Sequence, residues 1–364
     1  MTAAVHPWNL DKAARIVRDR ERMPHALLLG GSNGLGKSAF AEWLARLLLC
    51  AQPSAAGEPC GRCQSCRLFA AGTHPDLHVV QSEAVYKAAA TPFALHALRY
   101  AIDDKKDRKK DSAVIQIAQV RALIESSQTR PQLAACKVLV LSPADSMNVS
   151  AANSLLKMLE EPPPDSFFVL VADRPARLPP TIRSRCRLLE FLAPAREQAL
   201  EWLDREGIGE SAGLLLDPAG GAPLQALALA RDDFLVKREQ LLHDLGQLLS
   251  GRLDPVTAAT RWKGLGTGSC LGWLGGFIAD LIRQRTTGND GASALANPEA
   301  SRFLQDYKNV LDLNKLFLFL DAVSEAKNGI DSGSLDELLL LEDVLIRWCQ
   351  IAAGAHTIKT RAAS

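Results

Sequence analysis

The sequence contains a phosphate-binding pattern, G-x4-G-K-[ST], between Gly31 and Ser38. Glycines in such a loop let backbone N–H groups turn inward around a phosphate, and the helix that follows adds its positive end. A short apolar run, His25–Leu29, precedes the pattern, and an apolar-periodic segment, Ser38–Cys50, follows it. This strand–loop–helix context predicts a P-loop fold. The residues expected to face a nucleotide are Gly31, Gly34, Gly36, Lys37 and Ser38.

Two further apolar runs, Lys137–Leu141 and Phe167–Val171, have the length and character of buried strands. Strands that alternate with helices predict a parallel α/β sheet with helices on its faces. After Phe191 only helical periodicity remains. Helices are expected at 9–22, 38–50, 117–129, 150–160, 197–206, 211–216, 224–230, 234–249, 270–285, 301–328 and 334–351. The expected domains are a P-loop α/β domain (1–193), a small helical lid domain (194–233) and an all-helical C-terminal domain (234–364).

Four of the eight cysteines form a cluster in the sequence. They are Cys50, Cys60, Cys63 and Cys66. In a reducing compartment, clustered thiols are metal ligands more often than disulfides. Four thiolates favour a closed, tetrahedral Zn²⁺ site with a structural role. The spacing of the last three cysteines also resembles iron–sulfur ligation, but the C-x3-C-P continuation is absent, so zinc is the predicted metal.

The second predicted strand runs directly into Ser142-Pro143. At this point P-loop ATPases carry an Asp that holds Mg²⁺, and AAA+ members add a Glu that activates water. Neither Ser142 nor Pro143 offers a carboxylate, and Asp145 lies beyond the proline. The sequence therefore predicts that this chain does not hydrolyse ATP. Binding of ATP with Mg²⁺ at the P-loop itself stays open.

The formal net charge is +1, so no global basic field drives nonspecific binding to nucleic acid. The N-terminal 22 residues mix charges with short apolar pieces, which predicts no secretory signal, and no apolar run reaches the roughly 18 residues of a membrane span. The expected location is the cytoplasm, without a membrane partner. A mixed charge run, Asp103–Asp111, lies in a segment without periodicity, 84–112. We interpret it as a solvated insertion, with a loop that contacts DNA or a partner as the alternative.

Several motifs follow one another in a specific order. They are the P-loop, the four cysteines, Gly72–Asp76, Asn153–Pro163 and Ser184-Arg185-Cys186. This succession resembles the clamp-loader AAA+ subunits of bacterial DNA polymerase III over essentially the whole α/β region. The family contains tau/gamma ATPase subunits and a stator subunit. The His-Pro-Trp opening, and Ser142-Pro143 in place of Asp-Glu, resemble the stator.

The resemblance implies a role in the polymerase III holoenzyme, in a complex that opens the ring-shaped sliding clamp and places it on primed DNA. The stator of this family packs against the delta subunit and a tau/gamma ATPase subunit, and the C-terminal domains form a helical collar. Its Ser-Arg-Cys arginine, here Arg185, reaches in trans toward ATP held by the neighbouring subunit. Leu224 stands where the ATPase subunits have a sensor arginine, which again argues against turnover.

Two other functions are compatible with parts of the sequence. A clamp-loader-type AAA+ ATPase that is active in its own right would use the P-loop, and Ser142, Pro143 and Leu224 argue against it. A zinc-ribbon module that binds nucleic acid would use the cysteines, but no basic or aromatic cluster flanks them.

Overall fold

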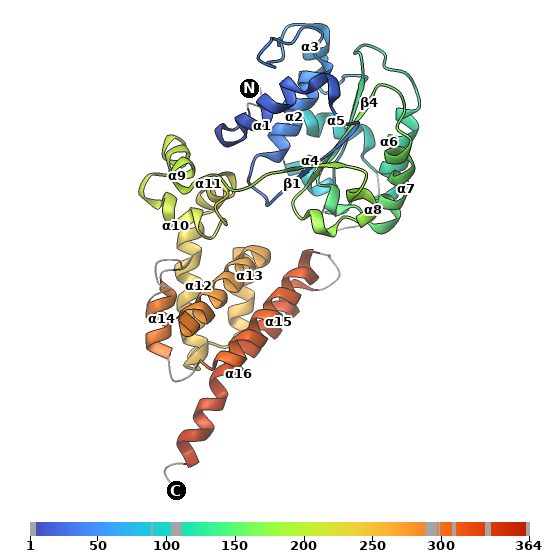
Figure 1. Ribbon diagram of the computed structural model, residues 1–364. Coiled ribbons are helices and arrows are strands. Elements are labelled where there is room, and N and C mark those ends of the chain that lie inside the picture. Colours follow the sequence, from blue (N-terminus) through green and yellow to red (C-terminus); the bar gives the residue numbers. More distant parts are fainter. Residues whose placement is uncertain are drawn as a thin grey trace. The chain divides into compact units, whose positions relative to one another are not determined.

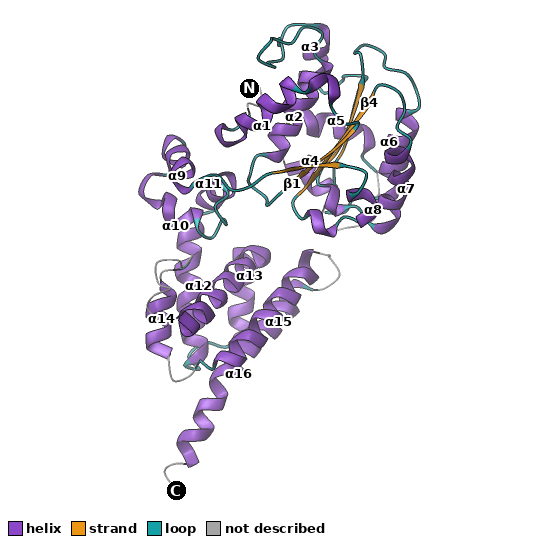
Figure 2. Cartoon of the chain, in the orientation of Figure 1, coloured by secondary structure: helices purple, strands orange, loops and turns teal. Residues whose placement is uncertain are grey.

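The computed structural model describes residues 5–88, 90–102, 111–287, 297, 299–307, 311–331 and 336–361. The chain divides into two compact units, Met1–Pro194 and Ala195–Ser364 (Figure 1). The first unit contains a parallel sheet with helices on both sides, and the described part of the second unit is helical (Figure 2). This architecture confirms the predicted P-loop α/β class of the AAA+ type, followed by a helical region.

A five-stranded parallel sheet in the order β2-β3-β4-β1-β5 forms the centre of the first unit. The strands are β1 (Ala26–Gly30), β2 (Leu77–Val80), β3 (Lys137–Leu141), β4 (Ser166–Ala172) and β5 (Arg187–Glu190). Helix α2 (Lys37–Leu49) packs on one face, and α6 (Ile117–Ser127) and α7 (Val149–Glu160) cover the other. Because both faces are covered, β1 and β3 are apolar and buried at nearly every position.

Two strands were missed by the sequence prediction, which contains only β1, β3 and β4. Strand β2 includes the polar residue His78, whose Nδ1 lies 2.6 Å from the hydroxyl oxygen of Tyr100 in the core. Strand β5 lies at the edge of the sheet, and most of its side chains are exposed. A polar residue in one strand and solvent exposure of the other removed the continuous apolar pattern that identifies buried strands.

The remaining helices of the first unit are α1 (Leu10–Arg18), α3 (Gln64–Ala70), α4 (Glu83–Ala88), α5 (Pro92–Ala97) and α8 (Pro180–Arg183). The absence of periodicity predicted for 84–112 is wrong in part, because α4 and α5 lie there. The Thr91 side chain caps α5 by accepting the backbone N–H of Ala94, and Pro92 starts the helix. Most of the predicted charge run, 103–110, lies outside the described residues.

The second unit contains α9 (Arg196–Arg205), α10 (Ala212–Leu216), α11 (Pro223–Arg231), α12 (Phe234–Leu249), α13 (Pro255–Thr287), α14 (Glu299–Tyr307), α15 (Leu313–Asp331) and α16 (Glu337–Arg361). Trp262, Phe277 and Trp348 are fully buried in its core. Over Pro255–Thr286, α13 is long and apolar enough to cross a membrane, but more than half of its most apolar window is buried against neighbouring helices. Its apolar character is therefore that of a core helix.

One helix prediction in this unit is wrong, and one helix was missed. The helix expected at 270–285 is present in the second part of α13, whereas the first part, which begins at Pro255, was not predicted; the backbone leaves the helical region between the two parts, at Gly266. Nearby glycines at 264 and 268 had weakened the periodicity there. The single helix expected at 301–328 is two helices, α14 and α15. Asp312 starts the second of them by accepting the backbone N–H of Lys315 at 3.1 Å.

Asp76 joins the start of β2 to the segment that leads into β3. Its side chain is fully buried, and its carboxylate accepts the backbone N–H groups of Gln132, Leu133 and Ala134 at 2.6, 2.8 and 2.8 Å. Burial alone would raise the pKa of this carboxyl, but the three N–H donors outweigh burial and lower it. The Gly72–Asp76 motif therefore has a structural role at this point of the sheet.

We expect Asp76→Ala to lower the free energy of unfolding of the first unit by about 3 kcal/mol or more, because three backbone N–H groups lose their bonds to a fully buried carboxylate. Chemical denaturation at pH 7 measures the loss. Because the folded pKa is lowered, the stabilisation by Asp76 is complete above the unfolded value of about 3.9 and is lost as the pH falls through the folded pKa. The exposed Asp11 is the control, and Asp11→Ala should cost less than about 1 kcal/mol. Equal losses in both variants would contradict this role.

Candidate functional site

The predicted P-loop connects the carboxyl end of β1 to the first turn of α2. Its glycines are required by close packing. A Cβ on Gly31 would lie 2.1 Å from the carbonyl oxygen of Phe191, and a Cβ on Gly36, whose φ is +85°, would lie 2.5 Å from the His6 ring. Side chains at these positions would therefore break the loop. The structure thus has the strand–loop–helix geometry that P-loops use to surround phosphate.

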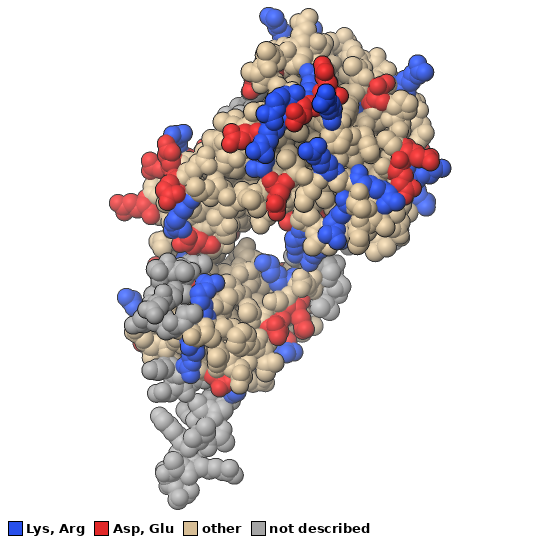
Figure 3. All heavy atoms as spheres, in the orientation of Figure 1, with Lys and Arg blue, Asp and Glu red and all other residues tan. Residues whose placement is uncertain are grey.

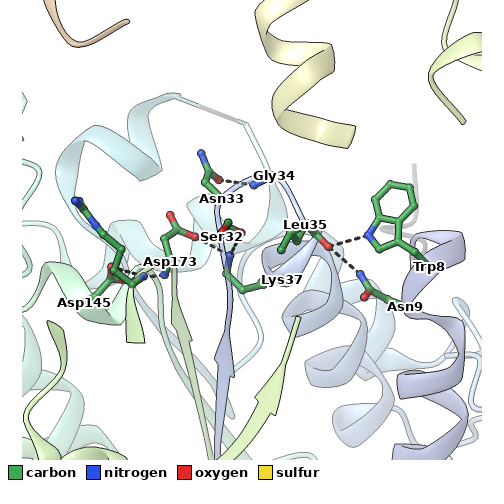
Figure 4. Close-up of polar contacts among 10 residues, drawn as sticks. Trp8, Asn9, Ser32, Asn33, Gly34, Leu35, Lys37, Asp145 and Asp173 are labelled. Atoms are coloured by element: carbon green, nitrogen blue, oxygen red, sulfur yellow. Dashed lines mark hydrogen bonds and ion pairs between the residues drawn. The ribbon is translucent and has the colours of Figure 1, made fainter. Parts of the chain in front are cut away.

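The Lys37 side chain is almost completely buried beneath the loop, with 3% of its area exposed. Its Nζ donates to the carbonyl oxygen of Ser32 at 2.6 Å and lies 2.7 Å from Oδ1 of Asp173 (Figure 4). Asp173 directly follows β4, which is the neighbour of β1 in the sheet. The ammonium group that a P-loop offers to phosphate is therefore paired with a carboxylate of the same chain.

A segment near the N-terminus holds the outer side of the loop. The indole Nε1 of Trp8 and the Nδ2 of Asn9 both donate to the carbonyl oxygen of Leu35, at 3.0 and 2.9 Å (Figure 4). Asn9 is fully buried, and the ring of His6 stacks on that of Trp8 at 4.8 Å. The His-Pro-Trp opening is thus part of the P-loop environment.

Asp145 is not directed at the P-loop. Its carboxylate accepts the backbone N–H groups of Asp173 and Arg174 at 3.1 and 3.0 Å, so that it holds the end of β4 (Figure 4). The end of β3 carries Ser142 and Pro143. No carboxylate at the end of β3 is thus positioned to hold Mg²⁺ or to activate water at this site. Leu224 lies in the first turn of α11.

The four clustered cysteines converge in the structure. Their Sγ atoms all lie within 4.8 Å of one another, and neighbouring Sγ atoms in a tetrahedral Zn²⁺ site lie about 3.8 Å apart. Cys50 caps the C-terminus of α2, and Cys63 caps the N-terminus of α3. The cluster is positioned to bind a metal and belongs to the α/β unit, because two of that unit's helices present its ligands.

Hydrogen bonds prepare the sulfur atoms for a cation. The backbone N–H groups of Cys60, Cys63 and Cys66 lie 3.3 to 3.4 Å from the Sγ atoms of Cys50, Cys60 and Cys63. Backbone N–H donors lower the pKa of the Cys60 thiol to about 6, whereas burial raises the pKa of Cys66 to about 12. A bound cation favours the thiolate form. Four sulfur ligands without a carboxylate or imidazole suit Zn²⁺ and leave no position for a substrate.

Arg185 lies just after α8, which ends at Arg183. One guanidinium nitrogen donates to the carbonyl oxygen of Thr181 at 2.8 Å, and the other lies 2.5 Å from Oε1 of Glu160 at the end of α7. The Arg185 and Glu160 side chains are about one-third and one-half exposed, so a partner can reach the pair. The arginine is held in place and is accessible from the surface.

The sequence analysis missed three residues that shape these sites. Asp173 pairs with Lys37, Asn9 binds the P-loop backbone, and Glu160 pairs with Arg185. One signal was available for Asp173. It follows an apolar strand, and the carboxyl ends of parallel strands meet at the same edge of a sheet, where ligands bind. No local pattern marks Asn9 or Glu160, because each acts through residues distant in the sequence.

The fold and the loop define a P-loop protein of the AAA+ type. A family model described as "DNA polymerase III, delta subunit" matches residues 11–195, and a model of the C-terminal part of that subunit matches residues 232–350. DNA polymerase III subunit delta' from Pseudomonas aeruginosa is 31% identical, over 96% of this chain and 98% of the relative. The Escherichia coli subunit delta' is also 31% identical, over 94% of both chains. The chain belongs to the delta-prime subunit family of DNA polymerase III.

Among the solved structures that the chain matches is that of a DNA polymerase III gamma subunit-related protein from Thermotoga maritima. It is 17% identical, with a TM-score of 0.39, and the match covers 94% of this chain and 99% of that one.

Proposed function

We propose that the chain is the stator subunit of a DNA polymerase III clamp loader and helps to load the sliding clamp on primed DNA. In this role it supplies Arg185 in trans to ATP bound by a neighbouring subunit. One observation carries the proposal. The chain presents an accessible arginine after α8, while its own strand β3 is followed by Ser142-Pro143 and not by a metal-binding carboxylate. It thus offers one half of an ATPase site and lacks the other.

The proposed partners are a tau/gamma ATPase subunit and the delta subunit, with the sliding clamp and primed DNA contacted through the complex. The proposed domains are the P-loop domain (1–193), a lid (194–233) and a collar domain (234–364) that joins the subunits. The expected location is the cytoplasm. Acidic and basic side chains are interspersed on the face drawn in Figure 3.

In the loader, the Arg185 guanidinium would exchange its partner. In the free chain it pairs with Glu160. Transfer of a phosphoryl group to water builds negative charge on the γ-phosphate, and a planar guanidinium fork stabilises that charge. Glu160 keeps the fork oriented until a phosphate replaces it. A surface ion pair contributes only about 0–1 kcal/mol, so the exchange costs little.

The cysteine cluster is proposed to hold one structural Zn²⁺ per chain through Cys50, Cys60, Cys63 and Cys66. The ion would fix the loop between α2 and α3 to the α/β unit. Because all four ligands are thiolates, the proposed ion takes no part in phosphate chemistry.

We expect the isolated chain to hydrolyse no ATP, because the end of β3 offers neither a metal ligand nor a base for water. Added to its cognate tau/gamma and delta subunits, it should permit clamp loading on primed DNA. The measurements are phosphate release by the chain alone, and clamp loading with and without it. ATP turnover by the isolated chain that Lys37→Ala abolishes would identify it as an ATPase in its own right. Clamp loading that proceeds equally well without the chain would remove the stator proposal.

A further inference from the structure

We infer that Asp173 closes the P-loop to nucleotide by pairing with the ammonium group that a phosphate would need. The stator proposal leaves the occupancy of the P-loop open, so this inference stands independently of it. It also gives a physical reason for the proposed lack of ATP hydrolysis by a chain with an intact P-loop sequence. Asp173 thereby becomes the residue that determines whether this site accepts a nucleotide.

The first step of the argument is the state of Lys37. A lysine ammonium has three donors. One N–H group is directed at the carbonyl oxygen of Ser32, and another at the Asp173 carboxylate, at 2.6 and 2.7 Å. The lysine is buried, so its charge is compensated inside the protein rather than by solvent. A β- or γ-phosphate must therefore compete with the Asp173 carboxylate for this ammonium group.

The second step is the position of the carboxylate. The Asp173 side chain is 39% exposed, whereas Lys37 is 3% exposed. Asp173 is therefore the partner of the pair that solvent can reach, and it lies at the carboxyl end of β4, beside the P-loop. Even after displacement its negative charge stays close to the phosphates and repels them. The end of β3 provides no metal-binding carboxylate that would keep a compensating Mg²⁺ there.

The third step is the rigidity of this arrangement. The Asp145 carboxylate holds the backbone N–H groups of Asp173 and Arg174, which fixes the start of the Asp173 side chain. On the outer side of the loop, Trp8 and Asn9 both hold the carbonyl oxygen of Leu35. Neither the strand end nor the loop can therefore withdraw without losing hydrogen bonds. The pair is preorganised in the closed state.

Asp173→Asn tests the inference. The amide oxygen can still accept from Lys37, so the fold is retained, but the negative charge is removed. We expect this variant to bind ATP at least about tenfold more tightly than the natural chain, both with and without Mg²⁺, because a phosphate then competes with a neutral acceptor. Titration calorimetry with ATP measures the affinity. Adding Lys37→Ala to this variant should abolish the gain.

Asp165→Asn is the matched control. Asp165 immediately precedes β4, at the end opposite Asp173, is exposed, and has a positive φ of 56° that asparagine tolerates. It removes the same charge and should leave ATP affinity unchanged. Circular dichroism and metal content identify any variant that misfolds, and Asp173→Ala then serves as the second test. Equal ATP affinity in the natural chain and in Asp173→Asn overturns the inference. So does a loss of Mg²⁺-dependent ATP binding in Asp173→Asn, which would make Asp173 a metal ligand.

Discussion

Cys63→Ser is expected to remove the bound zinc and to destabilise the α/β unit by several kcal/mol. Structural zinc sites contribute apparent binding free energies of about 10–16 kcal/mol to folding, and three remaining thiolates retain only part of that. The substitution isolates the metal, because Cys63 also caps α3 by accepting the backbone N–H of Cys66, and serine is an equally good cap. Metal analysis should give one zinc per natural chain and less than one in the variant, with a lower melting temperature.

Cys136→Ser is the control for this experiment. Cys136 is buried in the same unit but stands outside the cluster, and its thiol donates to the carbonyl oxygen of Leu48. The variant should keep its zinc, whatever its effect on stability. A natural chain without zinc, or one that contains iron and shows the visible absorption of an iron–sulfur cluster, would overturn the assignment of the metal.

Arg185→Ala is expected to slow ATP hydrolysis at the one site of the loader that this chain serves by about 10³-fold or more, the usual value of an arginine finger. Total turnover should fall only in part, because the other ATP sites of the loader do not depend on this residue. Clamp loading should fall with it. Clamp-stimulated phosphate release and clamp loading by the reconstituted complex are the measurements. Folding, zinc content and assembly should be unchanged, because among the described residues the side-chain partner lost outside its own segment is the surface residue Glu160.

Two further variants separate charge from shape. Arg185→Lys should restore little activity, because a point charge does not reproduce the planar fork of a guanidinium. Arg183→Ala removes an exposed arginine from the same short segment and should have a much smaller effect. Normal clamp loading by a complex that carries Arg185→Ala would leave the chain as a scaffold without a catalytic contribution.

The sequence identified those parts of the fold that leave a local pattern. Strands β1, β3 and β4 are covered on both faces, so they read as continuous apolar runs. Strand β2 was missed because its polar residue, His78, is accommodated by Tyr100, 22 residues further along the chain. Strand β5 was missed because an exposed edge strand needs no apolar pattern. The contacts that make β2 and β5 strands are therefore tertiary contacts, and neighbouring residues in the sequence do not indicate them.

The candidate sites also divide into a part that local sequence patterns predict and a part that depends on tertiary contacts. The cysteine ligands are close in sequence, and their spacing alone predicted a cluster that the structure brings together. The carboxylate beside Lys37 was not predicted, because P-loop ATPases carry their metal-binding carboxylate at the end of β3, where this chain has Ser142-Pro143. Asp173 comes from the adjacent strand β4, and its pairing with Lys37 depends on the order of strands in the sheet. The order of strands in a sheet cannot be predicted from the residues of any single segment.

Helix α2 connects two of these features directly. It begins at Lys37 in the P-loop and ends next to Cys50, a member of the cysteine cluster. A helix of this length is a stiff rod of about 20 Å. A tilt of the helix at its P-loop end would therefore also move the Cys50 sulfur atom at its other end. Cobalt bound by the four cysteines would report such a movement as a change in visible absorption.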